Sequence, residues 1–141
     1  MSVNENWQAL VKEIAAFLTA QKKTVAVAES CTGGNIAAML TSFSGSSNFF
    51  DGGIIAYSEK VKNIQLQVKK QDIKKYSAVS EQVALQMAVG VKRQFQSDYA
   101  LATTGYAGPK GEKVGQVFIS FASKGKNHVT SHLFEGERKE I

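Results

Sequence analysis

The chain has 141 residues, 43% hydrophobic and 21% charged, which is typical of one globular domain with a single core. It contains no run near the roughly 18 apolar residues of a membrane span, no secretion signal, and only one cysteine, so we expect a soluble cytoplasmic protein without disulfides. The net charge of +5 is local, because residues 60–75 hold six lysines against one aspartate and the rest of the chain is neutral.

The first half of the chain predicts a helix, a strand and a second helix, followed by another strand–helix pair. The opening helix is indicated by apolar residues at helical spacing: Trp7, Leu10, Val11, Ile14, Phe17 and Leu18. The apolar, β-branched segment 24–28 predicts a buried strand, and a small-residue turn leads from it into a helix at 35–40. After a loop at 45–47, we expect a strand at 53–57 and a lysine-rich helix at about 59–68.

The second half predicts one long helix and three strands. Ser80 and Glu81 open the helix, in which apolar residues recur every fourth position. Strands are expected at 99–103, 114–123 and 129–134, with a turn at 124–127 between the last two. Helices that alternate with strands, followed by a hairpin, predict a single-domain α/β sandwich over residues 1–141, with a mixed sheet flanked by helices.

The strongest local motif is the segment Glu-Ser-Cys-Thr-Gly-Gly at 29–34, between a strand and a helix. Such a turn presents backbone N–H groups and the helix dipole to an anion, and Ser30 would be a nucleophile or a phosphate donor. A tight turn that merely needs glycine explains the motif equally well. Cys31 is an alternative nucleophile, but a lone cysteine is more often a small buried hydrophobe. Adjacent residues at a strand end point to opposite sides, so we expect at most one of Ser30 and Cys31 to face a site.

A serine nucleophile needs a base within hydrogen-bond reach. His128 and His132 lie four residues apart in a predicted strand, a span of about 13 Å that rules out a shared metal, and we do not favour either of them as the catalytic base. Lysines whose pKa is lowered are the remaining candidates, and both Lys60 and Lys62 follow the second strand. Spacing alone does not choose between them.

A second glycine-containing strand end occurs at 103–105. If its strand lies near that of Ser30, both turns open at the same carboxyl edge, where α/β sheets bind ligands. Thr104 would then be a hydroxyl donor to the substrate, although an ordinary strand-terminating turn explains the segment as well.

The lysines of 60–75 are compatible with three interpretations: a solvated helix face, a site for a small phosphorylated ligand, or a nucleic-acid backbone site. Tyr76 is the only aromatic residue nearby, so bases would have little to stack on. We therefore favour the solvated face and expect no nucleic-acid partner.

Four blocks in a fixed order resemble the nicotinamide-nucleotide amidase family, also known as the CinA C-terminal domain (competence/damage-inducible protein). They are AESCTGG at 28–34, GSSNFFDGGIIAYSEKVK at 45–62, AVSEQVALQMAVG at 78–90 and TGYAGPKG at 104–111. Several blocks at matching separations are far more specific than any single motif.

The resemblance implies cofactor-free and metal-free hydrolysis of the carboxamide of nicotinamide mononucleotide, which gives nicotinate mononucleotide and ammonia. It implies Ser30 as the nucleophile and Lys62 as the base, with Tyr57 assisting. Backbone N–H groups between Cys31 and Gly34 would stabilise the tetrahedral oxyanion. The implied substrate-binding residues are Thr32, Gly33, Gly34, Thr104, Gly105 and Arg138.

Two departures from the family pattern are visible. The loop at 110–115 is shorter than usual and lacks the proline of a Pro-Val-Gly ending. Members continue beyond a Gly-Asp/Glu-Arg block into a closing helix, whereas this chain ends at Ile141 soon after residues 136–138, so we expect that helix to be absent. Arg138 either reaches the substrate phosphate or is an exposed terminal arginine.

Two alternatives to the amidase remain at this stage: a non-catalytic nucleotide-binding module, and a competence or DNA-damage accessory protein that uses its lysines. The expected partner is a small pyridine mononucleotide. A sheet without its last helix would have apolar surface to bury, so we also expect a homo-oligomer, a dimer.

Overall fold

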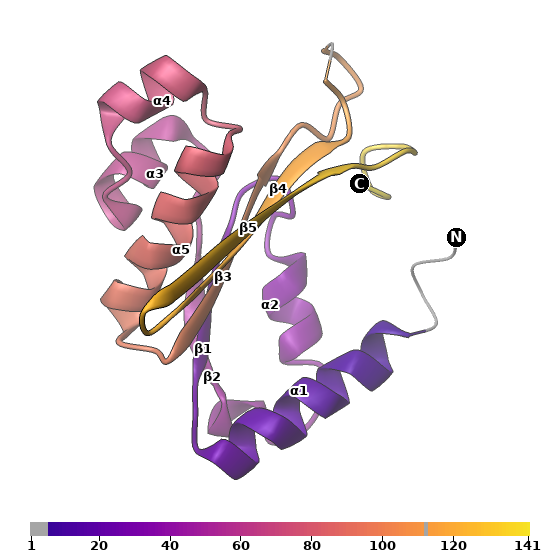
Figure 1. Ribbon diagram of the computed structural model, residues 1–141. Helices are drawn as coiled ribbons and strands as arrows, with labels where there is room; N and C mark the ends of the chain where they lie inside the picture. Colours follow the sequence, from indigo (N-terminus) through magenta and orange to yellow (C-terminus); the bar gives the residue numbers. More distant parts are fainter. Residues whose placement is uncertain (1–5, 112) are drawn as a thin grey trace.

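The computed structural model describes residues 6–111 and 113–141 (Figure 1). The first six elements are α1 (Trp7–Gln21), β1 (Val25–Glu29), α2 (Asn35–Leu40), a 3-10 turn η1 (Ser46–Asn48), β2 (Phe50–Ile55) and α3 (Glu59–Leu66). The remaining five are α4 (Lys70–Tyr76), α5 (Glu81–Phe95), β3 (Tyr99–Gly105), β4 (Gln116–Ser123) and β5 (Lys126–Leu133).

The five strands form one mixed sheet in the order β2-β1-β3-β4-β5. Strands β2, β1 and β3 are parallel, whereas β4 is antiparallel to both of its neighbours. In this register Glu29, the last residue of β1, lies opposite Ile55 on β2 and Thr103 on β3. The carboxyl ends of the three parallel strands therefore meet at one edge of the sheet, and the predicted mixed α/β architecture is confirmed.

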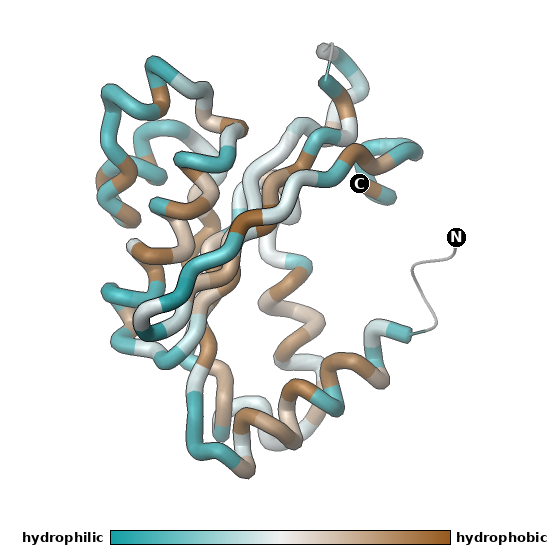
Figure 2. Tube along the Cα trace, viewed as in Figure 1, coloured by the Kyte–Doolittle hydropathy of each residue, from teal (hydrophilic) through white to brown (hydrophobic). Residues whose placement is uncertain are grey.

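Helices cover the two faces of the sheet unequally (Figure 1). On one face α5 packs across the strands, with α3 and α4 outside it, and on the other face α2 lies against β1 and β2. Each face has its own apolar cluster, one centred on Leu66, Met87 and Val91 and the other on Leu18, Val27 and Phe49. Figure 2 shows the hydrophobic residues concentrated along the inner strands and the helix faces turned towards them.

An apolar hollow of about 650 Å³ lies between α1 and the sheet, mainly at strands β3 and β4. Leu101 and Tyr99 belong to its wall, and the half-exposed Leu10, Phe17 and Phe121 surround it. In the part of the chain that the structure describes, no helix is both long and apolar enough to cross a bilayer.

The structure differs from the expected elements most clearly at three places, besides shifts of one or two residues at other strand ends. Strand β2 spans Phe50–Ile55 instead of 53–57, because Phe50 already pairs with Val25 and the chain leaves the sheet after Ile55. Helix α4 was not predicted, since Ile73 is its only buried residue and its seven residues show no apolar stripe. Strand β5 begins at Lys126, so the turn of the final hairpin is shorter than expected.

Candidate active site

A hollow of about 270 Å³ opens at the carboxyl edge of the parallel strands. The turns after β1 and β3 meet there, and the N–H of Ser30 donates a hydrogen bond to the Thr103 carbonyl at 3.2 Å. The hollow is lined by Ser30, Cys31, Tyr57, Lys62, Ala78, Val79, Thr104, Gly105, Tyr106, Ala107, Gly108, Lys110 and Arg138. The expectation that the two turns open on the same edge is thus correct.

Ser30 and Lys62 form a buried pair at the floor of this hollow. The Lys62 Nζ lies 2.9 Å from the Ser30 Oγ, 2.8 Å from the Ala56 carbonyl oxygen and 3.4 Å from the Tyr57 carbonyl oxygen. The two carbonyls accept hydrogen bonds from the Lys62 amine in either of its charge states. The Ser30 Oγ accepts a third hydrogen bond from the ammonium form, whereas a neutral amine would instead accept one from the Ser30 hydroxyl.

Burial shifts the Lys62 amine towards its neutral form. Its side chain is 2% exposed, and burial lowers the pKa of the amine below its ordinary value of 10.5, because an ammonium ion loses its hydration there. Cys31 and Glu59 oppose this effect only in smaller measure. Among the described residues the one ion pair is between Lys23 and Asp98, so no carboxylate within 4 Å holds the proton on Lys62.

The turn at 30–34 has a conformation that requires its two glycines. Gly33 and Gly34 adopt φ values of +60° and +108°, which residues with a Cβ rarely adopt, and a Cβ at Gly33 would meet open space. Neither glycine lines the hollow, and nor does Thr32, whose hydroxyl lies 2.8 Å from that of Thr103. The glycines therefore shape the turn instead of bringing the backbone close to the hollow.

Most N–H groups of this turn already have partners within the protein. The N–H of Gly33 donates to the Ser30 carbonyl, and that of Gly34 donates to the carboxylate of Glu29. The N–H groups of Cys31 and Thr32 approach the Cys31 sulfur and are the remaining donors of this turn that could serve an oxyanion near Ser30. The candidate oxyanion donors expected from the sequence, the N–H groups between Cys31 and Gly34, are thereby reduced to two.

Cys31 lies beside Ser30 and lines the same hollow, so the expectation that only one of the two faces the site is wrong. The alternation of a strand does not apply here, because β1 ends at Glu29 and both residues belong to the turn. Burial raises the pKa of the Cys31 thiol above 9.0, and nearby N–H groups and Lys62 only partly oppose this. A thiol held in its protonated form is a poor nucleophile, which leaves Ser30 as the better candidate.

Tyr57 and Arg138 lie at the mouth of the hollow. The Arg138 guanidinium donates to the Tyr57 hydroxyl and to the Gly108 carbonyl, the latter at 2.6 Å. Tyr57 contacts Lys62 through its backbone carbonyl, while its side chain is 58% exposed. Arg138 is exposed, as one of the two alternatives expected, and it also lines the hollow; its contact with a substrate phosphate stays a prediction.

Thr104 and Gly105 belong to the wall of the hollow, but they are the last residues of β3, so the turn that the sequence predicted at 103–105 begins only after Gly105. The Thr104 hydroxyl donates its hydrogen bond to the Ala78 carbonyl at 2.8 Å, so it faces the hollow as an acceptor and not as the expected donor. A Cβ on Gly105 would lie 2.7 Å from Val117 and 3.1 Å from the Cys31 sulfur. Gly105 therefore permits the close approach of β4 and of the Ser30 turn.

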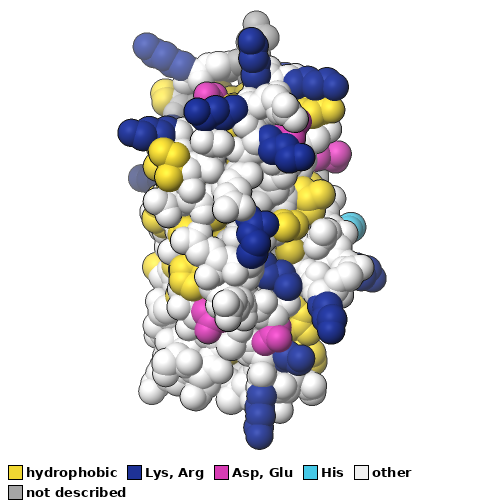
Figure 3. Space-filling view, turned by 90° about the vertical axis from the view of Figure 1, so that its left-hand side faces the viewer, with side chains coloured by type: hydrophobic (Ala, Val, Ile, Leu, Met, Phe, Trp, Pro, Cys, Tyr) yellow, Lys and Arg dark blue, Asp and Glu magenta, His cyan; other side chains and the backbone are white. Residues whose placement is uncertain are grey.

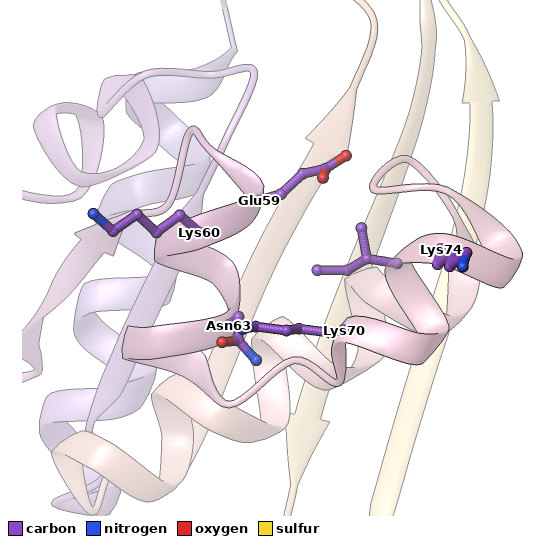
Figure 4. Close-up of a pocket in the computed structure, with 6 residues that line it drawn as sticks. Glu59, Lys60, Asn63, Lys70 and Lys74 are labelled. Carbon is purple, nitrogen blue, oxygen red and sulfur yellow. The ribbon is translucent and has the colours of Figure 1, made fainter.

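Lys60, the alternative base, lies in a different hollow of about 540 Å³ between α3 and α4, with Glu59, Asn63, Lys70, Ile73 and Lys74. Figure 4 shows that the Lys60 side chain points away from the other lysines of this hollow, so the ammonium groups do not converge. Figure 3 shows basic side chains spread over the face formed by the helices, as expected for a solvated surface.

The two histidines do not reach the hollow. His128 is exposed on β5, and His132 lies in the same strand with its Nε2 atom 2.8 Å from the Thr130 hydroxyl. Within 6–111 and 113–141, no group of three His, Cys, Asp or Glu residues is arranged to hold a metal ion.

Several lining residues were not found from the sequence. Ala78, Val79 and Tyr106 contribute to the hollow, and Lys110 adds a second cation at its mouth. Ala78 and Val79 precede α5 and have no chemistry of their own, so only the block AVSEQVALQMAVG marked their segment. The sequence motif assigned no role to Glu29, although a charged residue that ends an apolar strand needs a partner.

Comparisons with known proteins agree with this geometry. Residues 7–141 match the model of the CinA C-terminal domain family. A CinA-like protein of Syntrophomonas wolfei is 43% identical over 136 residues, which is 94% of this chain but 33% of that protein. A CinA-like protein of Gloeothece citriformis is 53% identical over 104 residues, which is 71% of this chain and 25% of that protein. The chain thus spans about a third or less of the length of these curated relatives.

Solved structures show the same fold. The competence/damage inducible protein CihA from Agrobacterium tumefaciens superimposes with a TM-score of 0.94 at 34% identity, covering 99% of this chain and 89% of that one. The competence damage-inducible protein A (ComA) from Klebsiella pneumoniae gives a TM-score of 0.93 at 33% identity, covering 96% and 87%. Together with the family match, these likenesses show that the chain belongs to the CinA C-terminal domain family.

Proposed function

We propose that this protein is an amidohydrolase that cleaves the carboxamide of nicotinamide mononucleotide through a Ser30–Lys62 pair. The observation that carries the proposal is the 2.9 Å contact between the Ser30 hydroxyl and the amine of a lysine that is buried and has a lowered pKa. A serine hydroxyl is a weak nucleophile until a base accepts its proton, and a neutral lysine within hydrogen-bond reach is such a base.

In the first half of the reaction, the neutral Lys62 amine takes the Ser30 proton while Oγ bonds to the carboxamide carbon. The carbonyl electron pair moves onto oxygen, where the N–H groups of Cys31 and Thr32 are the nearest candidates to stabilise it. When this intermediate collapses, the C–N bond breaks and the Lys62 ammonium returns its proton to the leaving amide nitrogen. Ammonia departs and an ester remains on Ser30.

In the second half, water replaces ammonia. Lys62, again neutral, accepts a proton from the attacking water, and the C–Oγ bond breaks as Ser30 takes that proton back. The product is a carboxylic acid, which ionises to nicotinate mononucleotide. The role of Tyr57 in this scheme is to hold Lys62 through its backbone carbonyl, so the identity of its side chain matters less than its place in the chain.

The charges of the hollow support an anionic substrate. Arg138 and Lys110 lie at its mouth, and no acidic residue is among its described lining. Two of the five guanidinium N–H groups of Arg138 are engaged, which leaves three for phosphate oxygens. A hollow of about 270 Å³ is at the small end for ligand pockets, as suits a pyridine carboxamide bound inside with its ribose phosphate near the mouth.

The direct test is ammonia release from nicotinamide mononucleotide by the wild type, by Ser30→Ala and by Ser47→Ala. Ser47 is an exposed serine outside the hollow and serves as the matched control. Release by the wild type and Ser47→Ala, but not by Ser30→Ala, would support both the reaction and the nucleophile. Calorimetric binding of the mononucleotide without ammonia release would refute the amidase and favour a nucleotide-binding module.

A further inference from the structure

Glu29 is a buried acid directly before the proposed nucleophile. Its side chain is 0% exposed and lies outside the lining of the hollow. The carboxylate accepts three backbone hydrogen bonds, from Gly34 at 3.2 Å, Ile36 at 2.9 Å and Ala37 at 3.0 Å. It makes no ion pair with any described residue. A buried carboxylate is costly unless such donors satisfy it, so these three bonds account for its presence.

These bonds join the two ends of the turn that carries Ser30. Glu29 ends β1, whereas Gly34, Ile36 and Ala37 form the start of α2. The cap residue of α2 is Gly34, which has no side chain to satisfy the first N–H groups of the helix. Glu29 therefore supplies the cap from the preceding strand and closes residues 30–34 into a loop with both ends fixed.

The same contact decides which groups of the turn are free for chemistry. The inner N–H groups of α2 and the positive end of its dipole face the Glu29 carboxylate, so they do not serve a substrate anion. The nucleophile and the two candidate oxyanion donors, Cys31 and Thr32, are all held between the anchored ends. Greater conformational freedom of the turn would move Ser30 relative to Lys62, because the position of Lys62 depends on a different helix, α3.

We infer that Glu29 is a positioning residue: its carboxylate, as the internal cap of α2, fixes Ser30 in line with Lys62 and the oxyanion donors. The inference rests on the proposed function, since it concerns how the Ser30 nucleophile is held. Because Glu29 does not touch the hollow, its loss acts on the reactivity of Ser30 and hardly on substrate binding.

The test compares Glu29→Gln with the wild type and with Glu13→Gln, an exposed acid on α1 that serves as the matched control. Glutamine has nearly the same shape, but its NH2 group faces a backbone N–H, so at least one of the three bonds is lost. The first readout is the rate at which a fluorophosphonate labels Ser30, located by mass spectrometry, which does not require the natural substrate to be known.

We expect labelling of Glu29→Gln to be slower by roughly 10- to 100-fold, since a displacement of about 1 Å can cost this much. With nicotinamide mononucleotide, kcat should fall in parallel while KM changes by less than about 3-fold. Hydrogen exchange should accelerate at Ile36 and Ala37 but not in β3. Glu29→Asp, which keeps the charge on a shorter side chain, should show the same pattern if the glutamine variant does not fold.

Unchanged labelling in a folded Glu29→Gln protein would overturn the inference, as would a loss confined to KM. Labelling of the wild type without ammonia release would refute the amidase. The comparison of labelling rates would then still test whether Glu29 positions Ser30. A folded wild type that is not labelled at Ser30 would refute the nucleophile, and with it the role assigned to Glu29.

Discussion

The contact between α3 and α5 leaves no room for a side chain at Gly90. A Cβ built on this residue would lie 2.2 Å from the Leu66 carbonyl oxygen and 3.0 Å from the Leu66 carbonyl carbon. Both atoms belong to the backbone, so no rotation of a flexible side chain can relieve the contact. Since Leu66 ends the helix that carries Lys62, this packing also sets where the proposed base lies.

The effect of Gly90→Ala follows from two opposing terms. Alanine favours the helix by up to about 1 kcal/mol relative to glycine. To accommodate it, α3 and α5 must separate by about 1 Å, and overpacking of this kind costs roughly 1–3 kcal/mol. We therefore expect the free energy of unfolding to fall by about 1–2 kcal/mol, which lowers the Tm by roughly 3–8 °C for a chain of this size.

Urea denaturation and thermal melting of Gly90→Ala measure the stability term, with Gln94→Ala on the exposed side of the same helix as control. The control should change the free energy of unfolding by less than about 0.5 kcal/mol. Ammonia release, at a temperature where both proteins are folded, measures the effect on activity. We expect the rate to fall by roughly 10-fold or more, because Lys62 moves with α3. A Gly90→Ala protein as stable and as active as the wild type would refute the packing argument.

Three further predictions concern the charges of the site. Turnover should rise with pH through a midpoint below 10.5 and then level off, because only neutral Lys62 accepts the Ser30 proton and burial lowers the pKa of Lys62. A turnover that does not change with pH would contradict this. Between the lowered pKa and 10.5, the folded protein binds fewer protons at Lys62 than the unfolded protein does. The free energy of unfolding of the wild type, measured by urea titration, should therefore rise with pH in this range relative to that of Lys62→Met. A difference between the two proteins that does not change with pH would argue against a neutral amine. Arg138→Ala should raise KM for the mononucleotide by roughly 10-fold or more with a smaller loss of kcat, and an equal loss in both would place Arg138 in the chemical step.

The sheet was predictable because its local signals agree with one another. Apolar, β-branched strands, glycine-containing ends and amphipathic helices alternate along the chain, and the final hairpin turns a parallel sheet into a mixed one. Helix α4 was not predicted because it is held by one buried side chain, Ile73, while lysines occupy half of its other positions. Such a helix owes its place to packing on α5 more than to its own sequence pattern.

The proposed Ser30–Lys62 pair was predictable only in part. Parallel strands share a carboxyl edge, so the meeting of the Ser30 turn with the strand end at 103–105 could be expected from the sequence. The choice between Lys60 and Lys62 could not, because two residues apart on a helix means about 200° around its axis, and the sequence does not say which side faces the sheet. The family pattern favoured Lys62, and α3 packs with Lys62 inward and Lys60 outward.

The surroundings of Lys62 explain why the proposed base needs no acidic partner. A carboxylate next to the amine would favour the ammonium form, which has no lone pair to accept the Ser30 proton. Burial does the opposite, since it withdraws water from the charged form while the Ala56 and Tyr57 carbonyls still satisfy the two N–H groups of the neutral form. The one buried acid nearby in sequence, Glu29, is turned instead to the N–H groups of α2. The fold thus uses its buried carboxylate to anchor the turn of the proposed nucleophile, and keeps its negative charge away from the amine, whose ammonium form it would favour.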